Sequence, residues 1–304
     1  MILNKINPNE IVEIYSNTNT LIDIMDFIQS HETLHSYMVE NISNDFKKTS
    51  KDFINFLKKY INFPIAIKIT KIKEPINFFN KNIFNHLDNI HREHIENEQK
   101  LAAIQNYLSN ILEKKEKKKS TIKSLIKKHE THKSGLWLQA TSKRCTTLQL
   151  YIDALKNKKI ELSYISKYDK KEQTFEFSVD NFKCTTTSQK NKKIQSISLN
   201  KLYDSILQSS NILYEIIEQC YQEFIRKIKV FSKEINIIIK FSGLIDFIVT
   251  KAYIAQEFNY CKPIIDANAE KSYFDATAIR HPLIEHINTE EIYEPNDISL
   301  DIIA

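Results

Sequence analysis

Glycine is almost absent from this chain, and its scarcity is the strongest constraint on what the chain can build. The 304 residues include only two glycines, Gly135 and Gly243. A GxxxxGK[ST] phosphate loop or a GxGxxG dinucleotide turn needs glycine wherever the backbone closely approaches a phosphate. Two isolated glycines cannot form either motif. The sequence therefore excludes the common nucleotide-binding loops from the residues present here.

Most of the chain shows the three- and four-residue apolar spacing of helices. We predict a first helix capped by Asn7, with Pro8 at its first position. Further helices are expected over 32–61 and 76–119, with 63–75 as a connector. Another helix should run from the cap-forming cluster Thr185–Ser188 to about residue 241, followed by a bend at Gly243 and a last helix to about residue 258.

The periodicity changes in the middle of the chain. The segments TIKSLIKKH, GLWLQATS, IELSYIS and TFEFSV are short and alternating or β-rich, as expected of strands, and KRCTTLQLYIDALKNKK between them favours a short helix. We therefore predict a mainly α fold in which long helical arms carry an inserted small α/β unit.

Charge is distributed unevenly around this unit. Residues 114–193 hold 21 Lys or Arg against 8 Asp or Glu, whereas the remainder holds 22 basic and 30 acidic residues. A strongly cationic segment between acidic surroundings is typical of a surface that binds a polyanion.

Other features restrict the compartment. The four cysteines are widely spaced without a CxxC pair, which argues against structural zinc and favours free thiols in a reducing, intracellular compartment. The N-terminal residues lack the apolar core of a signal peptide. The most apolar segment is interrupted by Lys240, Asp246 and Lys251, so we predict a buried helix and no membrane contact.

Several segments resemble the MutS family of DNA mismatch repair proteins. IKSLIKKHETHKSGLWLQATSKR is similar to the point where that family's lever helix enters its clamp, and FKCTTTSQKNKKI to the return into the second lever arm. FSGLIDFIVTKAYIAQEFNYCKP resembles the closing core segment. RHPLIE is close to the RHPVVE that opens the family's ATPase domain, and YEPNDISLD resembles the segment before its phosphate loop. The resemblance runs from about Thr121 onward and is weaker before it.

The resemblance implies a division into a helical core and outgoing lever (1–119), a clamp insertion (120–186), a returning lever and core (187–272) and the start of an ATPase domain (273–304). It implies duplex DNA as partner, ATP and Mg²⁺ as cofactors of the full-length family with none in this chain, and a homodimer formed through the missing ATPase domain. Base composition and the long clamp suggest a relative from a large DNA virus. The family's mismatch-reading Phe-x-Glu wedge is absent from this sequence, so no mismatch selection and no ATP hydrolysis are expected.

The candidate DNA contacts are cations and hydroxyls of the basic segment, because phosphate contact needs flexible cations and hydroxyl or backbone donors. They are Lys143, Arg144, Lys156, Lys158, Lys159, Lys183, Thr185, Thr186 and Lys190, with Lys192 and Lys193 in the same cluster. The threonines are expected at a helix start, which is a ready anion site. By resemblance, Tyr293 and Asn296 are candidates for the nucleotide-adjacent segment, although without a complete ATPase domain a frayed segment is expected there.

Simpler interpretations stand beside these. Trp137 in a short alternating strand is expected in the core. His91 and His94 are expected on a packed or solvated helix face, because no HExxH motif or third ligand accompanies them. A helical interaction scaffold, whose basic tip binds protein or an anionic surface, is the main alternative function. Another is that the ATPase belongs to a parent protein and this piece has no independent biochemical role.

Overall fold

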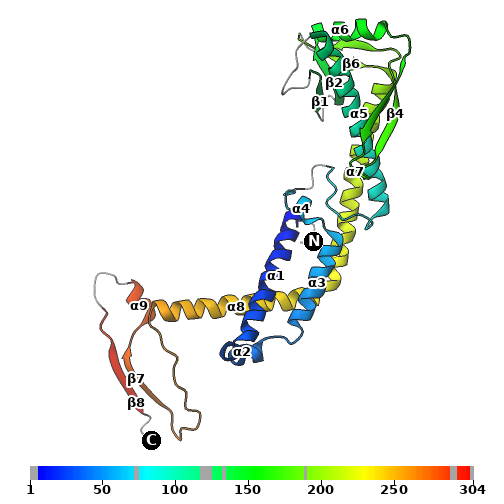
Figure 1. The fold of residues 1–304 in the computed structure, drawn as a ribbon. Coiled ribbons are helices and arrows are strands. Elements are labelled where there is room, and N and C mark those ends of the chain that lie inside the picture. Colours follow the sequence, from blue (N-terminus) through cyan, green and yellow to red (C-terminus); the bar gives the residue numbers. More distant parts are fainter. Residues whose placement is uncertain are drawn as a thin grey trace. The chain divides into compact units, whose positions relative to one another are not determined.

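The computed structural model describes residues 6–71, 75–116, 125–131, 135–187, 190–287 and 293–301. The chain is mainly helical with small antiparallel sheets, which confirms the predicted class (Figure 1). It divides into two compact units, Met1–Ile245 and Asp246–Ala304. Within the described residues, no helix combines the length and the apolar character needed to cross a membrane.

The first unit begins with α1 (Pro8–Ser30), α2 (Glu32–Met38), η2 (Val39–Asn41), α3 (Phe46–Tyr60) and α4 (Phe63–Ala66). The predicted cap is confirmed: Pro8 occupies the first position of α1, and the backbone N–H of Asn7 donates to the Glu10 carboxylate. The single helix predicted over 32–61 is wrong, because the chain leaves the helix at Asn41 and re-enters it at Phe46. Ser, Asn and Asp fill this break, and their side chains compete with helical backbone hydrogen bonds.

Aromatic packing fixes α3 against the later helices. Phe46 and Phe241 have ring centroids 4.1 Å apart, and Phe56 stacks on Phe224 at 5.7 Å with nearly parallel planes. Phe46 is fully buried. Buried aromatic pairs contribute about 0.5–1.5 kcal/mol beyond the area they bury, so this cluster is a main source of stability for the helical part of the unit.

Two long helices, α5 (Asn85–Glu116) and α7 (Ile197–Ile228), run side by side (Figure 1). The prediction that the first of them starts at 76 is wrong. Residues 75–84 are irregular instead: Phe79 forms a β-bridge with Ile61, and Asn82 has a positive φ of 66°. The lysine-rich end predicted to extend to 119 lies partly at 117–124, outside the described residues.

The start of α7 also differs from the prediction. The helix begins at Ile197, and its N-cap is Ser196, whose Oγ accepts the backbone N–H of Leu199 at 3.1 Å. Residues 183–186 and 191–195 form two paired strands instead, so the prediction of helix from the threonine cluster onward is wrong there.

The bend predicted at Gly243 is absent. Gly243 lies inside α8 (Ser232–Glu257), with no neighbouring atom close enough to require glycine there. The chain changes direction earlier, at the 3₁₀ turn η3 (Lys229–Phe231), which separates α7 from α8. A short 3₁₀ piece is a common connector between helices.

The inserted unit, here called the tip module, contains a four-stranded sheet in the order β1-β2-β6-β5. Its strands are β1 (Lys127–Thr131), β2 (Gly135–Thr141), β5 (Lys183–Thr186) and β6 (Asn191–Gln195). Helix α6 (Ser142–Asp153) and a separate hairpin, β3 (Lys159–Ile165) and β4 (Glu172–Ser178), complete the module. Strands overlap the predicted segments, the first of them only at 127–129 because 121–124 lie outside the described residues. The short helix is present, and the sheet continues past residue 186.

One tyrosine connects α7 to this sheet. Leu138 and Ile194 are paired across β2 and β6, and the Tyr203 hydroxyl lies between their backbones. It accepts the N–H of Leu138 at 3.0 Å and donates to the Ile194 carbonyl at 3.1 Å. All three residues are buried. The first turns of α7 are thus attached to the central strand pair.

The second unit contains β7 (Tyr273–Ile279), α9 (Pro282–Ile287) and β8 (Asn296–Asp301) beyond α8. Arg280 directly follows strand β7. Its guanidinium donates to the carbonyl of Phe258, at the end of α8, and to Glu285 of α9. The expectation of a frayed segment around Tyr293 and Asn296 is wrong. Asn296 pairs with Ile279, and the Tyr293 hydroxyl accepts the N–H of His281 at 3.1 Å.

Candidate nucleic-acid interface

The two faces of the four-stranded sheet differ in composition. One face carries Leu136, Leu138 and Ile194, which belong to the same buried cluster as the inward side chains of α5, α6 and α7. Because successive strand residues point to opposite faces, the other face is polar and cationic. We call it the basic face, and its residues are Lys127, His129, Trp137, Gln139, Lys183, Thr185, Lys193 and Gln195.

Side-chain contacts confirm that these residues share a face. The ammonium of Lys193 lies 5.2 Å from the centre of the Trp137 ring, and the His129 ring lies 4.2 Å from it on the neighbouring strand. At the other edge, the Thr185 hydroxyl donates to Gln195 Oε1 at 2.9 Å. The face is therefore continuous across all four strands.

Positive charge on the basic face has no acidic counterpart within the sheet. No Asp or Glu occupies a position on this face in β1, β2, β5 or β6. Lys127 and Lys193 stand in one row of the sheet, and because neighbouring strands lie about 4.8 Å apart, their Cα atoms are separated by about 10 Å. Lys183 lies on the adjacent edge strand. These lysines present a cationic surface suited to a row of phosphates.

Trp137 is the apolar residue of the basic face, and its neighbours on that face cover it. Its side chain is only 9% exposed and belongs to the core cluster, which confirms the expectation that it is a core residue. Its ring contacts Lys193 and His129, which limits the room for a base to stack on it. The Trp137 indole N–H has no hydrogen-bond partner among the described residues.

The predicted contact residues occupy different environments. Lys143, Lys156 and Lys190 are exposed, in α6, in the α6–β3 turn and beside β6. Others already have partners within the protein: Arg144 donates to the carbonyl of Leu125, and the Lys158 ammonium donates to that of Ile152 at 2.7 Å, near the end of α6. Lys159 pairs with Glu176 at 2.9 Å on the exposed hairpin. Sequence spacing could not separate these two groups.

The anion site expected at a helix start needs correction. Thr185 and Thr186 belong to strand β5, and Thr187 bonds to the Asn191 carbonyl, so none of them caps α7. Only Thr185, beside Lys183, contributes to the basic face. Ser188 lies outside the described residues.

Lys127 is the contact candidate that sequence reasoning missed, and Lys193 was given only as part of a cluster. Both fall in the same row because β1 and β6 flank β2, at Gln139. The alternating pattern of each strand was visible in the sequence. The pairing of strands from opposite ends of the module was not.

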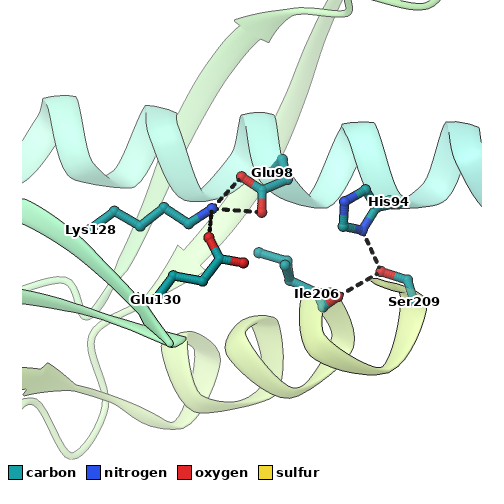
Figure 2. Close-up of polar contacts among 6 residues, drawn as sticks. All are labelled: His94, Glu98, Lys128, Glu130, Ile206 and Ser209. Atoms are coloured by element: carbon teal, nitrogen blue, oxygen red, sulfur yellow. Dashed lines mark hydrogen bonds and ion pairs between the residues drawn. The ribbon is translucent and has the colours of Figure 1, made fainter. Parts of the chain in front are cut away.

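A polar network connects the sheet to the long helices (Figure 2). The Lys128 ammonium lies 3.0 Å from Glu98 of α5 and 2.8 Å from Glu130 of its own strand. Burial lowers the pKa of Lys128, but its hydrogen bonds to Glu130 and Glu98 outweigh this and raise the pKa overall. Lys128 therefore stays charged, and its ion pairs with Glu98 and Glu130 connect the core side of the sheet to α5.

Further along α5, His94 connects the two long helices. Its Nδ1 lies 2.9 Å from the Ser209 hydroxyl of α7, which in turn donates to the Ile206 carbonyl (Figure 2). Burial lowers the pKa of His94 and, together with the charge of His94, that of His91. In the described part of the chain, no three His, Cys, Asp or Glu side chains gather in a metal-binding arrangement. The hydrogen bond of His94 to Ser209 and its partial burial are those of a residue packed between two helices.

Comparison with known proteins finds relatives among the DNA mismatch repair proteins. No protein-family model matches the chain. A protein of Acanthamoeba polyphaga mimivirus, described as a DNA mismatch repair protein MutS homologue, is 26% identical over 297 residues, which is 94% of this chain. This similarity to a MutS homologue over almost the whole chain confirms the resemblance seen in the motifs. The DNA mismatch repair protein MSH3 of Vanderwaltozyma polyspora is 31% identical over 100 residues, 33% of this chain.

The matches cover only part of each relative. The chain spans 24% of the length of the mimivirus protein and 9% of that of the yeast protein. The viral match nevertheless covers 94% of this chain. It therefore includes helical segments before Thr121, where the motifs alone gave only a weak resemblance.

Proposed function

We propose that this chain grips duplex DNA by its phosphate backbone through the basic face, without reading sequence. The observation that carries the proposal is a sheet face that bears Lys127, Lys183 and Lys193, and on which none of the four strands places an acidic residue. The names of both relatives, which are DNA mismatch repair proteins, support DNA as the polyanion.

Lysine is suited to this task. Its ammonium is a flexible point charge that can follow phosphates of any sequence, and each neutralised phosphate releases condensed counterions. Sequence reading needs bidentate side chains such as Arg, Asn or Gln directed into a groove. Gln139, Asn191 and Gln195 are the amides that strand alternation places on this side of the sheet, and Gln195 already accepts a hydrogen bond from Thr185. Non-specific backbone binding is therefore the favoured mode.

The same proposal assigns a mechanical role to α5 and α7. They pack side by side, and Tyr203 and the Lys128–Glu98 pair attach them to the sheet. A displacement of the tip module by DNA would thus be transmitted along the two helices. In the full-length family an ATPase domain with ATP and Mg²⁺, and a dimer formed through it, would use this coupling; for this protein both remain part of the proposal.

A salt titration tests the DNA contact. Charge reversal of Lys127, Lys183 and Lys193 to Glu should weaken duplex binding measured by fluorescence anisotropy. It should also flatten the plot of log K against log salt by about two to three units, because each phosphate contact contributes a slope of about −0.9.

The matched control reverses three exposed lysines between β3 and β4, away from the sheet: Lys167, Lys170 and Lys171. The net charge change is identical, so a loss of attraction from total charge alone would affect both variants equally. If the control and the basic-face variant have the same slope, the basic face is not the binding surface.

The rival function, an interaction scaffold with a basic tip, gives a different result. It predicts little DNA affinity, and binding to anionic vesicles or to an acidic protein that depends on the same lysines. Vesicle binding in the absence of measurable duplex binding would replace the DNA proposal by this alternative.

A further inference from the structure

Two cysteines meet on the core side of the tip module, behind the basic face. Cys145 lies in the first turns of α6 and is only 1% exposed. Its Sγ lies 3.7 Å from the Ala140 carbonyl of β2 and 4.0 Å from the Lys192 carbonyl of β6, so it rests directly on the sheet. The other, Cys184, belongs to edge strand β5.

The sheet register places Cys184 within reach of Cys145. Cys184 pairs with Ile194, which pairs with Leu138, so its side chain shares the core face that α6 covers. Strand β5 is the direct neighbour of β6, about 4.8 Å away. Helix α6, which carries Cys145, packs against β5 as well as against β2 and β6, so the two cysteines lie on facing elements. The sequence, with 38 residues between these cysteines, gave no sign of this pairing.

The pair has unequal acidity. The hydrogen bond from Cys184 lowers the pKa of the Cys145 thiol, and the nearby Lys192 ammonium acts in the same direction, against the effect of burial. The same pairing and burial raise the pKa of Cys184. A thiol of lowered pKa on one element, facing a second thiol on its neighbour, is an arrangement that can close to a disulfide on oxidation.

We propose that Cys145 and Cys184 form an oxidisable dithiol that closes to an intramolecular disulfide and fastens α6 to strand β5. The oxidant is a small peroxide, because burial excludes bulky reagents from Cys145. This inference stands apart from the DNA-binding proposal, since it concerns only the chemistry and stability of the module.

The reaction balances with hydrogen peroxide as the sole co-reactant. The Cys145 thiolate attacks one peroxide oxygen and expels hydroxide, which leaves a sulfenic acid. The Cys184 thiol then loses its proton and its sulfur attacks the sulfenic sulfur, forming the S–S bond and expelling a second hydroxide. The two protons released by the thiols convert both hydroxides to water. Two thiols are oxidised and one peroxide is reduced.

The bond would act on the strand that bears Lys183. Bonded sulfurs sit about 2.05 Å apart, closer than two thiols in non-bonded contact, so closure draws α6 and β5 together. β5 has only four residues and pairs with β6 on one side. Covalent attachment should therefore restrict β5 more than any other strand of the sheet, and reduction should release it.

The experiment treats the reduced chain with hydrogen peroxide and maps its thiols by mass spectrometry after alkylation. We expect loss of two hydrogens in the intact mass, a cross-linked peptide pair containing Cys145 and Cys184, and reversal by dithiothreitol. The melting temperature should rise by about 5 °C or more on oxidation. Cys184→Ser and, separately, Cys145→Ala should abolish both changes, so a folding defect in one variant leaves the other informative.

The remaining cysteines are internal controls. Cys220 is buried beside His86, and burial raises its pKa to about 11, so it should stay a thiol. Cys261 is exposed, and Cys261→Ser should leave the cross-link and the melting shift intact. Absence of the Cys145–Cys184 cross-link in oxidised wild type overturns the proposal, as does a cross-link without any change in melting temperature.

Discussion

At the scale of single residues, Tyr203 shows how one hydroxyl can join a helix to a sheet. Its hydroxyl accepts the N–H of Leu138 and donates to the carbonyl of Ile194, so it joins α7 to the paired strands β2 and β6. Burial raises the pKa of Tyr203 well above its usual range, so the hydroxyl stays protonated and keeps both bonds. The bridge is therefore insensitive to pH in the physiological range.

Tyr203→Phe should destabilise the chain by about 1–3 kcal/mol, because a buried N–H and a buried carbonyl lose their shared partner. Denaturant unfolding measures the change, and Tyr37→Phe on an exposed side chain should leave stability unaltered. Equal stability of Tyr203→Phe and wild type would mean that the two strands close directly once the hydroxyl is gone.

His94 and His91 give the helical arms a pH dependence whose sign follows from their lowered pKa values. The unfolded chain binds protons at a higher pH than the folded chain, so stability is fully present above the ordinary histidine pKa and falls as pH drops below it. Urea unfolding between about pH 7 and pH 5 should show this loss. The loss should be smaller in the double variant that carries His91→Gln and His94→Gln. An unchanged pH profile in this variant would contradict the assignment of the pH dependence to these two histidines.

At the scale of elements, local signals predicted the class and most strands, but not the long-range pairing. The cap at Asn7 and Pro8 and the strand around Trp137 follow from side-chain chemistry within a few residues. The two strands that replace the helix predicted after residue 183 could not be predicted in this way. They are stabilised by pairing with β2, which lies far away in the sequence. For the same reason the sequence named cations such as Lys158 that cap the module's own helix, and missed Lys127.

The extent of the tip module can be tested by deletion. Removing residues 125–195 should leave a helical remainder that melts cooperatively in circular dichroism, because α5 and α7 pack against each other along apolar faces. The shorter deletion of 121–186 retains β6 without its partners β2 and β5, and we expect it to aggregate. Loss of cooperative melting in the longer deletion would show that the helices depend on the module to fold.

At the scale of the whole molecule, the scarcity of glycine leads to a prediction about chemistry. The chain should release no phosphate from ATP above background, because it lacks the glycines of a phosphate loop. Turnover in a phosphate-release assay that disappears on substitution of Tyr293 or Asn296 would show that the C-terminal unit has been misinterpreted.

The molecule should also bind matched and mismatched duplexes about equally. Its sequence contains no Phe-x-Glu wedge, and the basic face offers lysines rather than a side chain that enters the base stack. Competition between matched and mismatched duplexes in fluorescence anisotropy measures this ratio. A clear preference for the mismatched duplex would require a base-contacting site elsewhere in the chain.

The strand order β1-β2-β6-β5 also determines how the tip module is put together in time. Pairs β1–β2, β3–β4 and β5–β6 each join neighbours in sequence, whereas β2–β6 joins Leu138 to Ile194 across α6 and the β3–β4 hairpin. Closing that large loop carries an entropic cost that the local hairpins do not pay. The pairing of β2 with β6 should therefore form after the local hairpins. Tyr203, which bonds to both of these strands, should gain its two partners at that last step.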